Sequence, residues 1–341
     1  MKPKFPVSAH CDGERFFNPV GQPPARSFSD QPKWWYQRLV LRQGSVWPKN
    51  IPAPLVPQLP ATVPAGQVAT TFIGHATFLL QLPGLNVLTD PMFSPRASPF
   101  SWAGPKRVRP PALTLAQLPR IDVVLVSHNH YDHLDLPTLR WLARERQPRF
   151  VTMLGNKAWL EKRGVHPVVE LDWWQAHAAT PELEIVCTPA QHFAARWPWD
   201  RCRTLWGGFA LQTPAGRIYF AGDSGYSSTF REIGARLGPF DLALLPIGAY
   251  EPRWFLAPVH CTPEEAVRIH RDVRSRQSVA MHFGTFQLTD EGIDEPLIAL
   301  AVARTAHGVA AADFLIPGFG ETRVTPLPWS AGRAHSFPIC V

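Results

Sequence analysis

Four potential metal ligands, His128, His130, Asp132 and His133, fall within six residues of the chain. Imidazole and carboxylate groups together suit zinc, iron or manganese far better than calcium or magnesium. In an extended loop, His128 and His130 can point to the same side and share one ion. Asp132 and His133 lie where the chain turns toward a helix, so they can serve a second ion beside the first. The run therefore predicts a site for two metals.

Two metals need more ligands than this run supplies, and three later residues can provide them. His192, Asp223 and His282 each come at or just past the end of an apolar run that is typical of a buried strand. A carboxylate such as Asp223 can bridge two cations. The predicted ligands are His128, His130, His192 and Asp223 for one metal, and Asp132, His133, Asp223 and His282 for the other. Each metal keeps room for a shared water, as a catalytic site requires.

The remaining histidines considered lack such a context, and we interpret them as structural or exposed: His10, His166, His177, His270 and His307.

The ligands need strands and helices to position them, and the apolar pattern supplies both. Short runs rich in β-formers predict strands at 68–73, 78–82, 86–89, 122–127, 150–153, 184–187, 208–212, 217–221, 242–246 and 278–282. Helices are expected at 31–42, 136–145, 156–163, 262–271 and 295–304. A meander followed by mixed strands and helices favours an α/β sandwich with helices outside two sheets. In such folds, sites lie at strand ends.

Composition limits the class of protein and the partners it can have. Of 341 residues, 45% are hydrophobic and 18% are charged, which excludes a disordered chain. Lys and Arg number 34 against 27 Asp and Glu, an excess compatible with anionic lipid, phosphate esters or nucleic acid. No apolar run approaches the ~18 residues of a membrane-spanning helix, and the N-terminus lacks the apolar stretch of a secretory signal.

Five scattered cysteines argue against a disulfide framework or a thiolate zinc site: Cys11, Cys187, Cys202, Cys261 and Cys340. We expect reduced thiols and a cytoplasmic protein that associates with membranes peripherally.

Several longer motifs accompany the ligand run: FFNP at 16–19, FIGHAT at 72–77, LTDP at 88–91, LDWW at 171–174, LWGG at 205–208, ALLPIGAYEPRWF at 243–255, HCTPEEAVRIH at 260–270 and MHFGTF at 281–286. The ligand run, with His192, Asp223 and His282 following in that order, resembles the metallo-β-lactamase superfamily. The longer motifs are narrower, and with them the chain resembles N-acylphosphatidylethanolamine-hydrolysing phospholipase D and its bacterial relatives.

This resemblance implies a four-layer αββα metallo-β-lactamase sandwich with two zinc ions, although manganese or iron would accept the same ligands. It also implies hydrolysis of a lipid phosphodiester to phosphatidic acid and an N-acylethanolamine, and a homodimer. The chain departs from the family pattern at Val259. In the mammalian pattern a Gln precedes the histidine that His260 matches, so the substitution puts the choice of lipid in doubt. The expected organisation is a Pro- and aromatic-rich segment over 1–66 that wraps the core, a hydrolase domain over 67–325 and a tail over 326–341.

The expected mechanism uses water activated by the metals. Two zinc ions can lower the pKa of a shared water from about 15.7 to about 7, and the resulting hydroxide would attack phosphorus in line with the leaving alkoxide. Asp132 and His260 are the predicted catalytic residues; His260 would contact the phosphate or protonate the leaving group, unless it is a structural histidine at a helix start. We expect His75 and Asp90 to support the ligands, because ligand histidines need an acceptor on their far nitrogen. For Asp90, a plain turn residue is the alternative.

Three segments mix aromatic and basic residues, as membrane interfaces do: 93–109, 193–206 and 250–256. They either contact a phospholipid surface or pack on the protein. Other substrates stay open, namely a nucleic-acid phosphodiester or a sugar lactone, as does a non-enzymatic metal-binding regulatory role. We expect no nucleic-acid partner, since the chain has no long Lys/Arg run and no added basic module.

Overall fold

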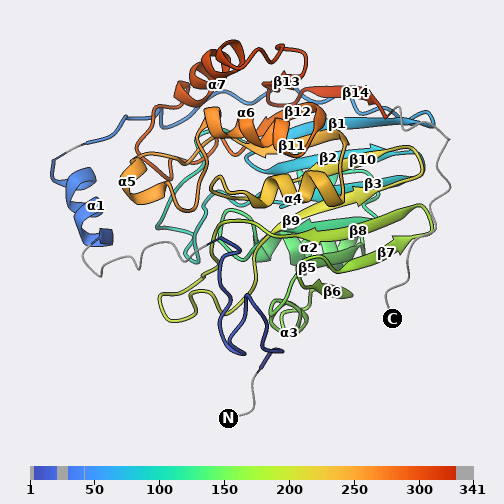
Figure 1. Cartoon of the computed structure of the whole chain (residues 1–341), viewed down its shortest axis with the longest axis horizontal. Helices are drawn as coiled ribbons and strands as arrows, with labels where there is room; N and C mark the ends of the chain where they lie inside the picture. Colours follow the sequence, from blue (N-terminus) through green and yellow to red (C-terminus); the bar gives the residue numbers. More distant parts are fainter. Residues whose placement is uncertain (1–3, 21–29, 42, 328–341) are drawn as a thin grey trace.

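The strands form two seven-stranded sheets that stack face to face in the computed structural model, which describes residues 4–20, 30–41 and 43–327 (Figure 1). The first sheet has the order β14 (Thr322–Pro326), β1 (Gln67–Gly74), β2 (Thr77–Leu82), β3 (Leu85–Thr89), β4 (Val123–Val126), β5 (Arg149–Met153) and β6 (Val168–Leu171). The second has the order β13 (Phe314–Leu315), β12 (Ser275–Met281), β11 (Phe240–Pro246), β10 (Arg217–Phe220), β9 (Gly208–Gln212), β8 (Leu183–Thr188) and β7 (Ala176–Thr180).

All ten predicted strands are present, and the predicted opening meander is the antiparallel series β1, β2 and β3. The four strands that the sequence did not predict are β6, β7, β13 and β14, and each lies at the edge of a sheet. Edge strands are half-covered and short, so they lack the continuous apolar run that marks a central strand. In β7 only Ala179 is buried.

Successive side chains of a central strand point to opposite faces of its sheet, so each strand packs both on the other sheet and on the outer helices. In β4, Val123 and Leu125 face the core between the sheets, whereas Val124 and Val126 pack in a second cluster with Leu139 of α2 (Leu136–Glu145). α3 (Lys157–Glu161) joins that second cluster through Leu160, so both helices cover the outer face of the first sheet.

The second sheet is covered by three helices: α4 (Thr229–Arg236), α6 (Pro263–Asp272) and α7 (Glu295–Ala306) (Figure 1). α6 begins as predicted, because Thr262 and Glu265 form a reciprocal cap. The sequence did not predict α4, whose Gly234 weakens a helical pattern. A Cβ at Gly234 would lie 2.0 Å from the Asp272 carbonyl oxygen, so glycine here permits close packing of α4 on α6.

The N-terminal region adds α1 (Asp30–Leu39), which begins one residue before the predicted range 31–42 and ends three residues earlier. The short helices η1 (Leu115–Gln117) and α5 (Arg253–Leu256) lie in loops. Parts of the predicted N-terminal segment lie outside the described residues, namely positions 1–3, 21–29 and 42. So does the predicted tail from residue 328 onward, which includes Cys340. In the described ranges, no helix has the length and apolar character needed to cross a bilayer.

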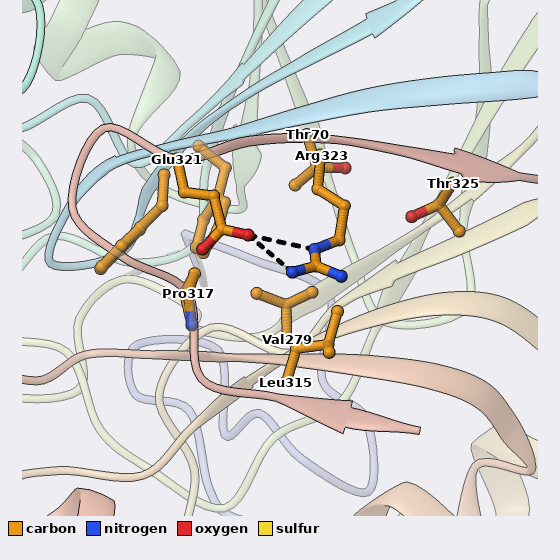
Figure 2. A pocket seen from close by; sticks show the side chains of 9 residues that line it. Thr70, Val279, Leu315, Pro317, Glu321, Arg323 and Thr325 are labelled. Carbon is orange, nitrogen blue, oxygen red and sulfur yellow. Dashed lines mark hydrogen bonds and ion pairs between the residues drawn. The ribbon is translucent and has the colours of Figure 1, made fainter. Parts of the chain in front are cut away.

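A small cavity opens between β1 and the strands β13 and β14 (Figure 2). Arg323 and Glu321 pair beside it over 2.7 Å, and Val279 and Leu315 form its apolar wall. Its volume of about 10 Å³ is room for a single water. None of the predicted site residues lines it, so this cavity is separate from the candidate site.

Candidate metal centre

The predicted ligands follow strands that end at one edge of the sandwich. The run 128–133 follows β4, His192 follows β8, Asp223 follows β10 and His282 comes directly after β12. β8, β10 and β12 run in the same direction, since β8 and β10 both pair antiparallel with β9, and β10, β11 and β12 are parallel. Their carboxyl ends therefore meet, as ligand-bearing strand ends do in α/β folds.

Three imidazole nitrogens converge in a first group. His130 Nδ1 lies 2.9 Å from His128 Nε2 and 3.3 Å from His192 Nε2. Nitrogens that share a tetrahedral zinc at ~2.05 Å lie roughly 3.3 Å apart. The first group therefore has the spacing of three ligands to one ion.

A second group combines imidazole with carboxylate. Asp132 Oδ2 lies 3.4 Å from both His133 Nε2 and His282 Nε2. Asp223 Oδ2 lies 3.2 Å and 3.1 Å from the same two nitrogens, and 3.9 Å from His192 Nε2 in the first group. The structure thus brings all seven predicted ligands together, with Asp223 between the two groups.

Several of these buried atoms have no hydrogen-bond partner among the residues that the structure describes. They include Nε2 of His133, Nε2 of His282 and Oδ1 of Asp223, whose side chains are at most 2% exposed. A buried polar atom without a partner costs about 1–3 kcal/mol. Cations at these positions would remove that cost, so the donor set fits two metal ions.

The charges of the site also fit cations. Burial alone would raise the pKa of Asp132 and Asp223, but His133 and its neighbours hold the pKa of both carboxyl groups well below the usual range. Burial lowers the pKa of His130 and His192 to about 3. These two imidazoles are therefore neutral, which is the form that binds metals. Asp223 and Asp132 instead raise the pKa of His282 to about 9, so this imidazole releases a proton when a cation binds.

Three of the predicted ligand histidines are oriented by acceptors on their far nitrogens. His133 donates from Nδ1 to Asp90 Oδ2 over 2.6 Å, and His192 donates from Nδ1 to the Val259 carbonyl oxygen over 2.8 Å. His128 Nδ1 lies 2.9 Å from Ser127 Oγ, whose own proton goes to Asp90. Each bond leaves Nε2 directed at the centre, as ligand histidines require.

His75 has a partner other than the one expected. It does not accept from a ligand histidine; instead its Nε2 lies 2.9 Å from Asp132 Oδ2. Its ring packs 4.1 Å from that of His282, whose backbone N–H donates to the His75 carbonyl. Both residues have positive φ, 57° and 61°, so the fold holds strained backbone at this site.

His260 lies at the more open side of the centre. Its Nδ1 is 4.0 Å from Asp223 Oδ2, its side chain is 12% exposed, and its ring is 4.9 Å from that of His192. Within the described part of the chain, Nδ1 has no hydrogen-bond partner. Arg253 holds the loop in place by donating to the His260 carbonyl over 2.8 Å.

The sequence analysis did not identify two supporting residues. Ser127 carried a signal, since it is the polar residue that directly precedes the ligand run. Arg196 carried none: it donates to the carbonyls of Asn129 and Leu134, both over 2.9 Å, and covers the ring of Tyr131 at 3.9 Å. It thereby clamps the loop that holds four of the predicted ligands.

The five histidines interpreted as structural or exposed lie outside the centre. His10 pairs with Asp172, His177 with Arg149, His270 with Ser278 and His307 with Glu264, and His166 is exposed.

An exposed group of aromatic rings, here called the aromatic patch, joins two of the predicted loops. It comprises Phe100, Trp102, Trp197 and Trp199, whose neighbouring ring centroids are 5.2–6.5 Å apart. Trp102 is 76% exposed and Trp199 68%. The second loop begins at the metal centre, where the Phe193 ring lies 4.5 Å from that of His130.

Comparisons with known proteins agree with this fold. A family model of the beta-lactamase superfamily domain matches residues 85–283. An uncharacterized protein of Mycobacterium tuberculosis is 44% identical over 273 residues, which is 78% of this chain and 72% of that protein. Among solved structures, Igni18, a metallo hydrolase of Ignicoccus hospitalis, aligns with a TM-score of 0.59 at 22% identity, over 76% of this chain and 98% of that one.

A further relative has a name that states an activity. The N-acyl-phosphatidylethanolamine-hydrolyzing phospholipase D 1 of Caenorhabditis elegans is 43% identical over 237 residues, which is 66% of this chain and 67% of that protein. The predicted αββα sandwich is confirmed, and the matched range contains all seven predicted ligands. The chain belongs to the metallo-β-lactamase superfamily of metal-dependent hydrolases, and it is similar to members named for hydrolysis of N-acyl-phosphatidylethanolamine.

Proposed function

We propose that the protein is a dinuclear metal phosphodiesterase of the phospholipase D type, which hydrolyses N-acyl phosphatidylethanolamine-like lipids to N-acylethanolamine and phosphatidic acid. The observation that carries the proposal is the position of Asp223, whose Oδ2 lies within 3.9 Å of ligand nitrogens in both groups. The name and 43% identity of the Caenorhabditis elegans relative support the substrate class.

Two zinc ions, or manganese or iron in their place, would supply Lewis acidity and an activated water. The protein's part is to hold the ligand atoms and the phosphodiester in register. Asp90 and the Val259 carbonyl fix imidazole orientations. His75 contacts Asp132 at Oδ2, the oxygen that also faces His133 and His282. The structure keeps these groups in place before substrate arrives, so no reorganisation is needed during reaction.

His260 is the residue we assign to the substrate. Its unpartnered Nδ1 and its partial exposure suit a hydrogen bond to a phosphate oxygen, or donation of a proton to the departing N-acylethanolamine oxygen. Burial is the main reason why the pKa of His260 lies well below its usual range in the metal-free protein. A phosphodiester's negative charge would favour the protonated form, which can donate.

We also propose that the aromatic patch contacts the phospholipid surface that presents the substrate. Indole rings favour the bilayer interface, and the exposed cations Lys106 and Arg203 lie in the same two loops. The loop that carries Trp197 and Trp199 begins beside the metal centre, where the Phe193 ring packs on that of His130. A lipid headgroup drawn toward the patch would therefore lie on the loop that leads to the predicted ligands.

A substrate panel tests this function. Purified protein with two equivalents of zinc is offered an N-acyl phosphatidylethanolamine, a chromogenic phosphodiester, a sugar lactone and structured RNA, each with and without chelator. We expect chelator-sensitive turnover of the lipid above the others. His282→Ala should abolish it, whereas His177→Ala, a histidine outside the centre, should not. Preferred turnover of the lactone or RNA, or no turnover of any substrate, would contradict the proposal.

A further inference from the structure

A strap formed by residues 10–20 lies against the loop 190–203, which carries His192 (Figure 1). Phe16 donates its backbone N–H to the Cys202 carbonyl over 2.8 Å, and its ring is 2% exposed in the main core. Arg15 donates to the Arg201 carbonyl over 3.0 Å, and Gln191 Nε2 donates to the Val20 carbonyl over 3.0 Å. The strap is thus anchored at both ends of this loop.

Between these anchors, the strap makes one contact with a ligand residue itself. The backbone N–H of His192 donates to Asn18 Oδ1 over 2.9 Å. On the other side, Gln191 donates its backbone N–H to Ser224 Oγ over 2.9 Å and accepts from the Gly225 backbone over 2.8 Å. The backbone that carries the His192 imidazole is therefore held between the strap and the loop that carries Asp223.

The side chain of His192 bonds from Nδ1 to the Val259 carbonyl, and its ring packs against those of Phe193 and His260. That bond sets the ring's rotation, but it does not fix where the backbone places the ring. The distance of 3.3 Å between His192 Nε2 and His130 Nδ1 depends on the rotation of the ring and on the position of the backbone. A backbone shift of a few tenths of an ångström would take the first group outside the ~0.2 Å tolerance of ligand distances.

We propose that Asn18 is a positioning residue for His192, so that the N-terminal strap completes the metal centre from outside the matched family domain, which spans 85–283. The inference rests on the proposed metal function of His192. Asn18 touches neither substrate nor metal; it acts by accepting the His192 amide proton.

Three variants test the proposal. Asn18→Leu removes the acceptor at similar volume, and Asn18→Asp keeps an acceptor oxygen. Asn86→Leu is the control, because Asn86 also bonds to the backbone, at the Arg120 carbonyl, but lies at the start of β3, remote from the ligands. The first measurement is the affinity of each of two zinc equivalents, by competition with a chromogenic chelator.

We expect Asn18→Leu to lower the affinity for one zinc equivalent by about 10–100-fold and to leave the affinity for the other unchanged. Asn18→Asp should bind both equivalents with the wild-type affinity. Unchanged affinity in Asn18→Leu, equal loss at both equivalents, or the same loss in Asn86→Leu would overturn the proposal.

A second measurement does not depend on metal or on turnover. Hydrogen exchange of the His192 amide in the metal-free protein should be about fivefold faster in Asn18→Leu than in wild type or Asn86→Leu. If this acceleration appears but wild type binds no metal, the proposed function fails while the hydrogen-bond role of Asn18 stands. If it is absent, the positioning role itself is wrong.

Discussion

His133 donates from Nδ1 to Oδ2 of Asp90 over 2.6 Å, and neither side chain has exposed surface. The same carboxylate accepts the backbone N–H and the hydroxyl of Ser127, whose oxygen lies 2.9 Å from His128 Nδ1. Asp90 therefore orients one histidine of each ligand group. A carboxylate outside the predicted ligand set thus links the two halves of the centre.

Replacing Asp90 by Asn should lower the affinity for both metals. The amide would keep the size of the side chain but place its NH2 group or a weaker acceptor against the His133 N–H. Loss of such an acceptor costs about 10–100-fold in metal affinity. Metal content after dialysis, by elemental analysis, measures the effect. The control is Asp122→Asn, whose carboxylate pairs with Arg120 before β4; unchanged content in Asp90→Asn would remove Asp90 from this role.

Asp223→Asn should lower metal content and phosphodiesterase activity together, because Asp223 is the ligand that both groups share. His192→Ala and His282→Ala should each lower the affinity chiefly for one of the two zinc equivalents. Titration of the metal-free proteins with zinc separates these outcomes. Full stoichiometry with full activity in Asp223→Asn would exclude Asp223 from the site.

Arg196→Gln should destabilise the protein. Two buried carbonyls, those of Asn129 and Leu134, would lose a charged donor, at a cost of about 1.5–3 kcal/mol. Urea unfolding measures the change in the free energy of unfolding. Arg203→Gln, at an exposed position on the same loop, should hardly change the free energy of unfolding. Equal changes in the two variants would show that the contacts of Arg196 contribute nothing to stability.

The double variant Trp197→Ser, Trp199→Ser should reduce co-sedimentation with anionic phospholipid vesicles by about tenfold, from the lost burial of two indoles. The control is Ile298→Ser, Val302→Ser, which removes two apolar side chains from α7 that are 64% and 65% exposed, against 40% and 68% for the two tryptophans. Retained vesicle binding in the tryptophan variant, or equal loss in the control, would contradict a role of the aromatic patch at membranes.

Glu291 gives a prediction for pH. Burial raises its pKa above the ordinary 4.5, although hydrogen bonds from Thr289 and the backbone of Ala249 and Glu251 lower it in part. The folded state thus holds a proton that the unfolded chain has released, so this residue's contribution to stability falls as pH rises from 4.5 through the folded pKa. The Tm of wild type minus the Tm of Glu291→Gln should fall as pH rises over that window. A difference in Tm that stays flat or rises would contradict the raised pKa.

The sequence predicted the elements and ligands that depend on local pattern. The central strands are continuous apolar runs, and each ligand stands at the end of one, so order along the chain was sufficient to predict His192, Asp223 and His282 as candidates. Edge strands such as β7 carry no such run, and α4 contains Gly234 for packing rather than for helix formation.

Supporting contacts between distant segments could not be predicted in this way. Asn18 and His192 are 174 positions apart, and Arg196 and Asn129 are 67 apart. No spacing rule relates such pairs, because their proximity is a product of tertiary packing. For the same reason the sequence pointed to His75 as a supporting residue but not to its contact with Asp132.

The most direct test of the proposed function is hydrolysis of an N-acyl phosphatidylethanolamine by the zinc-loaded protein in water enriched with oxygen-18, followed by mass spectrometry of the products. Attack at phosphorus breaks the bond to the N-acylethanolamine oxygen. We therefore expect one labelled oxygen in the phosphatidic acid and none in the N-acylethanolamine. Label in a released fatty acid, or no conversion of the lipid with both metal equivalents bound, would contradict a phospholipase D-type phosphodiesterase.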